Sequence, residues 1–430
     1  MIFEFELNKA IIDSLRSKQD AEETFTVFEE IAGYMFKNRK DLLSTEDINS
    51  IVNEYNSNYG ESVKTKSIIE VGLKSKVFRQ TDDMRIYFSN KNHLSYFIAK
   101  YLIRVAQESD SVGIEYALEN ICFGINSEII MFISYLLSDS KIINLIIGNA
   151  ETVFNNVEEL SFSKENISLL HKQKVSKIAA PSSGDQKRLQ KQKEKNEERI
   201  YSEEIIEAKN LFDYEEESIE DFNNKLIRAI KYTELISKSL PAFHSTLKLT
   251  QKREIIEKIY LYPRKIVYYL LNPIDSDIEL TCQEIMDYIK EKGIKKKNGK
   301  EYSEDDIMEL LSRSGLLLML GLFDHFAELA VSPKSYDLLL EKDLNDLSEF
   351  MIKLLVIDNS GDTDRLLQEA ETGIKEYKNT EYEIMIKYIV KKHLLTNRDI
   401  SYNKRQQIID KIFGKGYRKE FLIDSQKLLH

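Results

Sequence analysis

Apolar residues recur along most of this chain at intervals of three or four positions, which is the period of an α-helix. One stripe in the second half consists of Phe222, Leu226, Ala229, Ile236 and Leu240. Strand-like alternation is confined to the short stretch around residues 77–88. Only 5 prolines and 15 glycines occur in 430 residues, which favours long helices joined by short polar turns. The predicted fold class is therefore mainly α, with one β-hairpin.

The first 110 residues carry the pattern of a winged helix-turn-helix. An amphipathic helix is predicted over residues 24–38, and a second one begins after the capping sequence Ser44-Thr45-Glu46-Asp47. A third helix covers residues 63–73, and a hairpin follows with strands over 77–80 and 84–88. Three helices and a hairpin in this order predict a winged helix.

Beyond residue 201 the pattern is one helix after another. Breaks are predicted at Pro241, Pro263, Pro273, Pro333 and Gly361. Their spacing is irregular and shows no repeat consensus. Antiparallel helix pairs of the solenoid kind suit the helix lengths, and an irregular helical bundle suits them as well.

These patterns divide the chain into five predicted parts. They are a leading helix (1–22), a winged-helix domain (23–110), a helical bundle (111–171), a basic polar linker (172–200) and a C-terminal helical domain (201–430). The linker is poor in large apolar residues, so it buries too little surface to offset the entropy of ordering. The last part is predicted to present a surface to a partner.

Composition narrows the class of protein. A net charge of -11 argues against a protein dedicated to coating nucleic acid. The two cysteines, Cys122 and Cys282, form neither a disulfide framework nor a metal knuckle, which favours a reducing compartment. The chain starts without the basic and apolar regions of a signal peptide, and its apolar stretches are too short to span a bilayer. We therefore expect a cytoplasmic protein without a membrane partner.

Motifs for a self-sufficient active site are missing from the sequence. No Gly-x-x-x-x-Gly-Lys-Ser/Thr loop is present to hold a phosphate with its backbone N–H groups. The six histidines are far apart in sequence, so no zinc-ligand spacing occurs. A Gly-x-Ser-x-Gly nucleophile turn is also lacking. The sequence therefore predicts no catalytic residue, no metal ligand and no enzymatic activity of this chain alone.

The stretch from Phe88 to Leu102 carries the most specific pattern. Phe88 ends the predicted hairpin, and Tyr96, Phe97, Ala99 and Leu102 follow on an apolar helix. After three helices and a hairpin, this pattern resembles the end of the winged-helix domain in STAND-class NTPases, the NACHT-like regulatory ATPases of immunity. The resemblance covers residues 20 to 110, about a quarter of the chain.

Within that stretch, Asn90 stands where many members of the family carry a histidine that approaches the β-phosphate of ADP. Asparagine can still donate a hydrogen bond, but it cannot carry a positive charge. The resemblance therefore implies that Asn90 lies close to the nucleotide. A structural interpretation stays open beside it, because an asparagine just before a helix also caps the free N–H groups.

The resemblance implies that this chain is a regulatory part of a larger protein or complex. The ATP- and ADP-binding core would lie in an upstream segment or in a separate polypeptide, and we favour an upstream segment. In such proteins the winged helix clamps ADP in the resting state. The helices of residues 201–430 would then sense a protein trigger, which allows nucleotide exchange and oligomerisation. Bacterial antiphage defence is the usual setting of members with helical sensors.

Two other classes of function remain open. A winged helix can also bind DNA, and Lys64, Lys66, Lys74 and Arg79 lie on or beside the helix and wing that would contact a duplex. The third predicted helix nevertheless lacks Arg, Asn and Gln between Val63 and Phe78, and Lys alone mostly contacts phosphate. The last alternative is a scaffold that couples to neither nucleotide nor DNA.

Overall fold

The computed structural model describes residues 2–15, 21–107, 111–137, 140–171, 211–212, 221–296, 299–397 and 399–414. The predicted linker over residues 172–200 lies outside the described residues. The chain divides into two compact units. The first consists of Met1–Asn149 with Lys195–Lys231, and the second of Ala150–Glu194 with Tyr232–His430. Each unit is described by itself.

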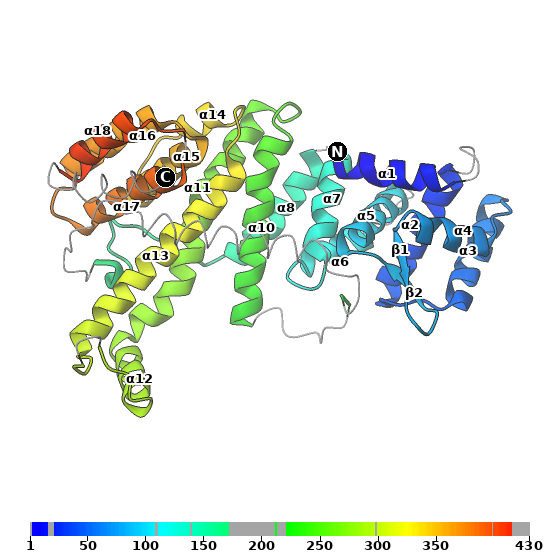
Figure 1. The fold of residues 1–430 in the computed structure, drawn as a ribbon, viewed down its shortest axis with the longest axis horizontal. Helices are drawn as coiled ribbons and strands as arrows, with labels where there is room; N and C mark the ends of the chain where they lie inside the picture. The colour runs from blue at the N-terminus through cyan, green and yellow to red at the C-terminus, as the bar shows by residue number, and fades with distance from the viewer. Residues whose placement is uncertain are drawn as a thin grey trace, which may run out of the picture. The chain divides into compact units, whose positions relative to one another are not determined.

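The first unit consists of helices and one hairpin (Figure 1). Its elements are α1 (Ile2–Ser14), α2 (Ala21–Asn38), α3 (Thr45–Tyr59), α4 (Thr65–Lys74), β1 (Phe78–Gln80), β2 (Ile86–Phe88), α5 (Lys91–Gln107), α6 (Val112–Glu119), α7 (Asn126–Leu137) and most of α8 (Ser140–Phe154). The start of α3 follows from its sequence, because Ser44 and Asp47 form the predicted capping box.

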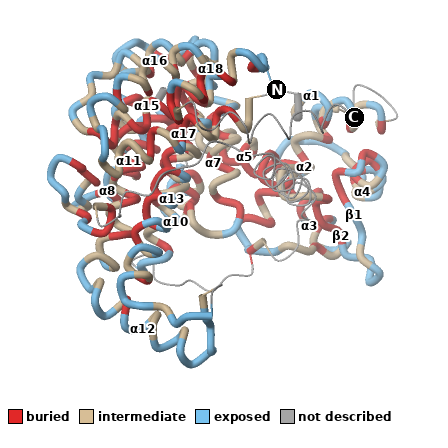
Figure 2. The backbone as a smooth tube through the Cα atoms, turned by 60° about the vertical axis from the view of Figure 1, so that its left-hand side comes forward, coloured by how far each residue is buried: buried red, intermediate tan, exposed pale blue. Residues whose placement is uncertain are grey.

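Aromatic rings from α2, the hairpin and α5 form the core of this unit. The ring centroid of Phe28 lies 4.7 Å from that of Phe78 and 5.6 Å from that of Phe97. Phe88 completes the cluster, 4.9 Å from Phe78 and 5.8 Å from Phe97. All four side chains are buried, and α2 and α5 carry long buried stretches in Figure 2. Each ring stabilises this packing by about 1.5–3 kcal/mol through burial alone.

The hairpin pairs Phe78 with Phe88 in antiparallel register. Its second strand begins at Ile86, two residues later than predicted, because Met84 adopts a positive φ of 64° and belongs to the turn. A further backbone bridge joins Ile86 to Leu43, in the segment between α2 and α3, with N–O distances of 2.8 and 2.9 Å. The chain before α3 is therefore tied to the edge of the hairpin.

The regular elements in the described part of the second unit are all helices (Figure 1). It contains the end of α8, η2 (Ser168–His171), most of α10 (Phe222–Ala242), α11 (Leu249–Ser276), α12 (Ile278–Glu291), α13 (Glu304–Ala330), α14 (Tyr336–Leu340), α15 (Leu347–Ser360), α16 (Thr363–Glu376), α17 (Glu381–Thr396) and α18 (Tyr402–Ile412). Helix α13 packs against α11 and α15, and α16 packs against α17. Helix α12 buries only Cys282 and is largely exposed in Figure 2.

One of the predicted helix breaks is wrong, because Pro263 lies in the middle of α11. Helix α10 ends at Ala242, directly after Pro241, and α11 ends at Ser276, three residues after Pro273. A proline inside a helix costs about 3 kcal/mol, because it removes a hydrogen bond and crowds the preceding turn. Around Pro263 the buried side chains Ile259 and Val267 recover more than this by packing. Pro333 does lie in a turn, and Gly361 ends α15 with a positive φ of 79°.

The predicted fold class is confirmed at the level of a mainly helical protein with one small hairpin. The described strands are β1 and β2, and together they form a two-stranded sheet.

Candidate functional site

The residues Ser89, Asn90 and His93 form a polar corner where β2 runs into α5. Asn90 precedes the helix, and its side-chain oxygen accepts a hydrogen bond of 2.9 Å from the backbone N–H of His93. The Asn90 amide nitrogen lies 3.4 and 3.5 Å from the two ring nitrogens of His93. The Ser89 hydroxyl lies 2.8 Å from Nδ1 of the same ring. Asn90 is therefore an N-cap of α5.

The His93 ring is held in its neutral form. Burial lowers the pKa of His93 from 6.5 to about 4, since the surroundings solvate a charged ring poorly. A neutral imidazole accepts a hydrogen bond through one ring nitrogen, and the Asn90 amide and the Ser89 hydroxyl are donors within reach. At neutral pH the corner consequently presents polar groups without a positive charge from this histidine.

The corner is anchored to the rest of the first unit. Lys91 forms an ion pair of 3.2 Å with Glu128 of α7. One helical turn on, the Tyr96 hydroxyl donates a 3.0 Å hydrogen bond to Glu4 of α1. Burial, with the nearby Glu4 carboxylate, raises the pKa of Tyr96 well above its usual value, so the hydroxyl keeps its proton. These contacts fix the start of α5 and with it the position of Asn90.

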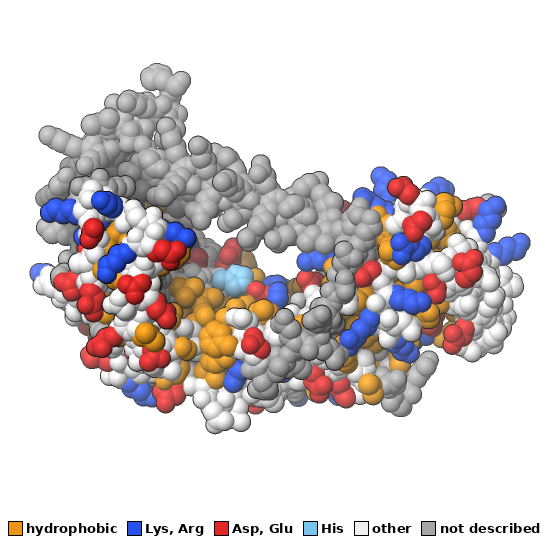
Figure 3. All heavy atoms as spheres, turned by 90° about the horizontal axis from the view of Figure 1, so that it is seen from below, with side chains coloured by type: hydrophobic (Ala, Val, Ile, Leu, Met, Phe, Trp, Pro, Cys, Tyr) orange, Lys and Arg blue, Asp and Glu red, His pale blue; other side chains and the backbone are white. Residues whose placement is uncertain are grey.

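The four basic residues considered for nucleic acid lie on α4 and the hairpin. Lys64, Lys66, Lys74 and Arg79 are all exposed. They do not form a separate basic face, because Lys66 pairs weakly with Glu70 at 3.9 Å and Lys74 donates to the backbone oxygen of Ser14 at 3.3 Å. Side chains of both charges are interspersed over the visible surface of the first unit in Figure 3.

Helix α1 packs against α4, the helix that would enter a DNA groove. The end of α1, the start of α2 and α4 enclose a pocket of about 520 Å³. Its lining contains Lys64 and Lys74, but also the carboxylates Glu23, Glu61 and Glu70. Mixed charges beside a partly covered helix do not give the continuous positive surface that a phosphate backbone requires.

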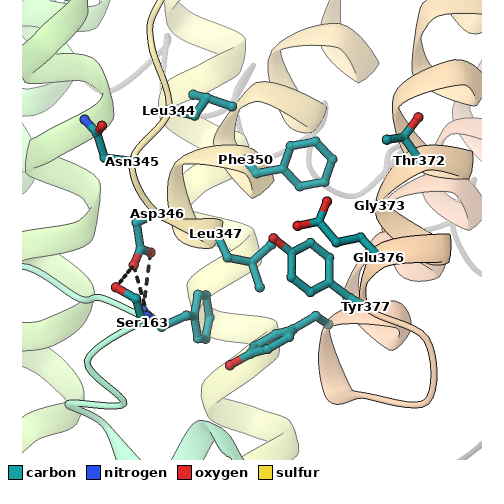
Figure 4. A pocket seen from close by; sticks show the side chains of 12 residues that line it. Ser163, Leu344, Asn345, Asp346, Leu347, Phe350, Thr372, Gly373, Glu376 and Tyr377 are labelled. Carbon is teal, nitrogen blue, oxygen red and sulfur yellow. Dashed lines mark hydrogen bonds between the residues drawn. The ribbon is translucent and has the colours of Figure 1, made fainter.

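A second pocket, of about 440 Å³, lies within the second unit (Figure 4). Four aromatic residues from separate segments line it: Phe162, Phe350, Tyr377 and Tyr382. Its other walls include Asp346, which precedes α15, and Glu376 at the end of α16. The sequence prediction missed this site, because each of these residues taken alone has the pattern of a core or surface position.

A buried hydroxyl–imidazole–carboxylate series lies elsewhere in the second unit. The Thr363 hydroxyl is 2.9 Å from Nε2 of His393, and Nδ1 of His393 is 2.8 Å from Asp358. The order of groups is that of a nucleophilic relay. However, His393 is only 1% exposed, and Asp358 also pairs with Lys392 at 2.9 Å. This network joins α15, α16 and α17, and we assign it a structural role.

Among the described residues, no group of three His, Cys, Asp or Glu side chains is placed to hold a metal ion. None of the described helices combines the length and apolar character needed to cross a bilayer.

The polar corner thus belongs to a helical unit in which a hairpin leads into a buried helix. The comparison with protein families gives a more specific result. Residues 41–98 match the family model described as Novel STAND NTPase 4. The match runs from just before α3 into α5, so it includes α4, the hairpin and the polar corner. This segment is therefore related to STAND NTPases, as the sequence pattern predicted. No curated protein and no solved structure matches the chain.

Proposed function

We propose that this chain is the regulatory and sensing part of a STAND-class NTPase. The observation that carries the proposal is the family match over residues 41–98, which ends beyond the polar corner at Asn90. In this proposal the ATPase core, with its phosphate-binding loop and metal ligands, lies outside these 430 residues. The chain itself contributes no catalytic residue.

The first unit would act as a winged helix that holds the nucleotide-bound resting state. Support comes from the order of α2, α3 and α4 followed by the hairpin, and from the bridge between Leu43 and Ile86. That bridge adds a third, one-residue strand segment to the hairpin, as expected for the sheet of a winged helix. The polar corner at Asn90 would then face the ADP held by the ATPase core.

The chemistry of the corner defines how such a contact would work. The Asn90 oxygen is occupied by the helix cap, so a contact to a phosphate oxygen would come from the amide group, whose nitrogen also lies 3.4 and 3.5 Å from the His93 ring nitrogens. His93 is neutral at pH 7 and adds no charge. ADP would therefore be held here by a neutral hydrogen bond, which is weaker than a charge-assisted one.

The helices of the second unit would recognise a protein trigger. A trigger that binds the open state more tightly shifts the population toward it, which permits exchange of ADP for ATP and oligomerisation. The proposed biological setting is bacterial antiphage defence, in the cytoplasm.

The test is ADP retention by the chain joined to its ATPase core. Asn90→Asp keeps the capping oxygen but replaces the amide donor by a negative charge. We expect it to speed ADP release at least about tenfold if Asn90 faces phosphate, while the thermal stability stays near that of the wild type. Asn92→Asp introduces the same charge two residues away and is the matched control. Equal release rates in all three proteins would return Asn90 to the role of a helix cap.

The exposed Lys64, Lys66, Lys74 and Arg79 keep DNA binding as a second candidate. It requires duplex binding by this chain that weakens steeply with salt. The double variant Lys64→Glu with Lys74→Glu should then weaken binding. If the wild type shows no binding at 50 mM salt, this candidate is wrong.

A further inference from the structure

The aromatic pocket of the second unit (Phe162, Asp346, Phe350, Glu376, Tyr377 and Tyr382) has a consistent chemical character. Three of its four aromatic rings are joined by edge-to-face contacts of Tyr382. Tyr382 lies 5.1 Å from Phe162 and 5.7 Å from Tyr377 between ring centroids, at 69° and 83°. Such edge-to-face contacts fix the rings and leave a preformed apolar wall.

The charges at this wall are negative. Of the twelve residues that line the pocket, Asp346 and Glu376 are acidic and none is Lys, Arg or His. Glu376 is exposed, and its carboxylate projects between Phe350 and Tyr377 in Figure 4. The pocket also lies at the end of α16, where the helix dipole adds negative character. Lys375 and Lys378, which flank this turn, are outside the lining.

The two carboxylates differ in what they can still bind. Asp346 accepts from the Ser163 hydroxyl and N–H at 3.0 and 3.1 Å and from the Ser348 N–H at 2.8 Å. Burial would raise its pKa, but these hydrogen bonds outweigh burial and lower it, so Asp346 is an ionised part of the framework. Burial and a hydrogen bond to Glu376 raise the pKa of Tyr377, so that hydroxyl keeps its proton and orients the Glu376 carboxylate. Glu376 is therefore the acid available to a ligand.

Aromatic rings beside an exposed carboxylate are the elements that recognise an organic cation. We propose that this aromatic pocket binds a guanidinium group, that of an arginine side chain from a partner protein. Glu376 pairs with the charge, and the rings of Phe350, Tyr377 and Tyr382 contact the planar faces. A guanidinium suits this arrangement better than an ammonium group, since it is planar and more weakly hydrated.

The exposure of several residues at the mouth of the pocket favours a partner protein over a free small molecule as the ligand. Glu376, Thr372, Asn345 and Ser163 are exposed, whereas small-molecule sites usually enclose most of the ligand. A side chain that enters an open pocket gains further contacts from the surface that carries it. The existence of such a partner protein rests on the proposed sensing function. The binding of a guanidinium group in this pocket does not depend on the nucleotide.

Binding of short capped peptides to the full chain tests the pocket directly. The probes are acetyl-Gly-Arg-Gly-amide, its Gln analogue and free choline, followed by ligand-observed NMR at low and high salt. We expect the Arg peptide to bind at least about tenfold more tightly than the Gln peptide, with the difference reduced by salt. Glu376→Gln should remove this preference. Phe350→Leu, which removes a ring and keeps an apolar side chain, should weaken the Arg peptide about threefold to thirtyfold.

Glu309→Gln is the matched control, because it removes an exposed carboxylate of α13 outside the pocket. It should leave the preference unchanged. Equal affinity for the Arg and Gln peptides, or an unchanged preference in Glu376→Gln, would overturn the inference. Binding of choline without binding of the Arg peptide would contradict the claim that the ligand is an arginine side chain of a partner protein. Each of these results leaves the ADP-retention test of Asn90 unaffected, so the two proposals fail separately.

Discussion

The neutral His93 of the polar corner makes the stability of the first unit depend on pH. In the folded chain the pKa of His93 is about 4, while in the unfolded chain it takes its ordinary value of 6.5. Between these two values the unfolded chain binds one proton that the folded chain does not. The free energy of unfolding therefore falls as pH decreases from 6.5 to 4. The full difference corresponds to about 3 kcal/mol, because one pKa unit is worth about 1.4 kcal/mol.

The surroundings of the His93 ring explain why its pKa is lowered. The protonated ring would need acceptors at both nitrogens, but the Asn90 amide can only donate, and it lies 3.4 Å from Nδ1. The Ser89 hydroxyl, 2.8 Å from Nδ1, could reorient to accept. A hydrogen bond of this kind does not replace the hydration that burial removes, and burial is the cause of the lowered pKa of His93. A buried imidazolium is therefore disfavoured.

The substitution His93→Gln isolates this effect, since glutamine does not titrate. Urea unfolding is followed at pH 7, 6, 5 and 4 by circular dichroism, because the chain has no tryptophan for fluorescence. The difference in unfolding free energy between wild type and variant should change by about 3 kcal/mol between pH 7 and pH 4, in the direction that disfavours the wild type. Two parallel stability curves would refute the reasoning, as would an NMR titration of His93 near pH 6.5.

Two further predictions concern packing. Gly72→Ala should destabilise the first unit by about 1–3 kcal/mol in chemical unfolding, because an added Cβ would lie 2.0 Å from the ring of Phe78. Gly148→Ala, where nothing lies within 4 Å, should instead be neutral or stabilising by up to about 1 kcal/mol, and the opposite order would show that α4 can shift freely. Arg264→Met should cost the second unit about 3–5 kcal/mol, because it leaves the buried Glu349 without its 3.0 Å partner. The double variant Arg264→Met with Glu349→Leu should recover most of that loss, and an unchanged loss would show that the pair itself is stabilising.

The features that were predicted correctly are those that depend on residues close together in the sequence. The box at Ser44, the turn before Ile86 and the cap at Asn90 each depend on residues within four positions of one another. The predicted structural interpretation of Asn90 is seen directly in its hydrogen bond to His93. Its role toward a nucleotide stays a prediction, because that role depends on atoms outside this chain.

The features that were not predicted, the continuous helix α11 and the aromatic pocket, depend on contacts between residues that are far apart in the sequence. Pro263 has the local pattern of a helix break, and only the tertiary packing of α11 keeps the helix continuous. The aromatic pocket brings Ser163, Asp346 and Glu376 together from three segments that are far apart in sequence. No spacing rule connects such residues, so the pocket becomes visible only in the folded unit.

Tertiary contacts also bear on the two proposed functions of the first unit. Its helix order and its basic residues fit a DNA-binding fold equally well, because the sequence does not show which side chains are covered by other helices. In the structure, α1 packs against α4 and Ser14 accepts a hydrogen bond from Lys74. A duplex that approached α4 from the side on which α1 packs would have to displace α1, which buries Leu7 and Ile11. Burial of two such side chains is worth about 3–6 kcal/mol, and that cost would be subtracted from the affinity of this binding mode. The proposed regulatory function requires no such displacement, which favours it over this mode of DNA binding.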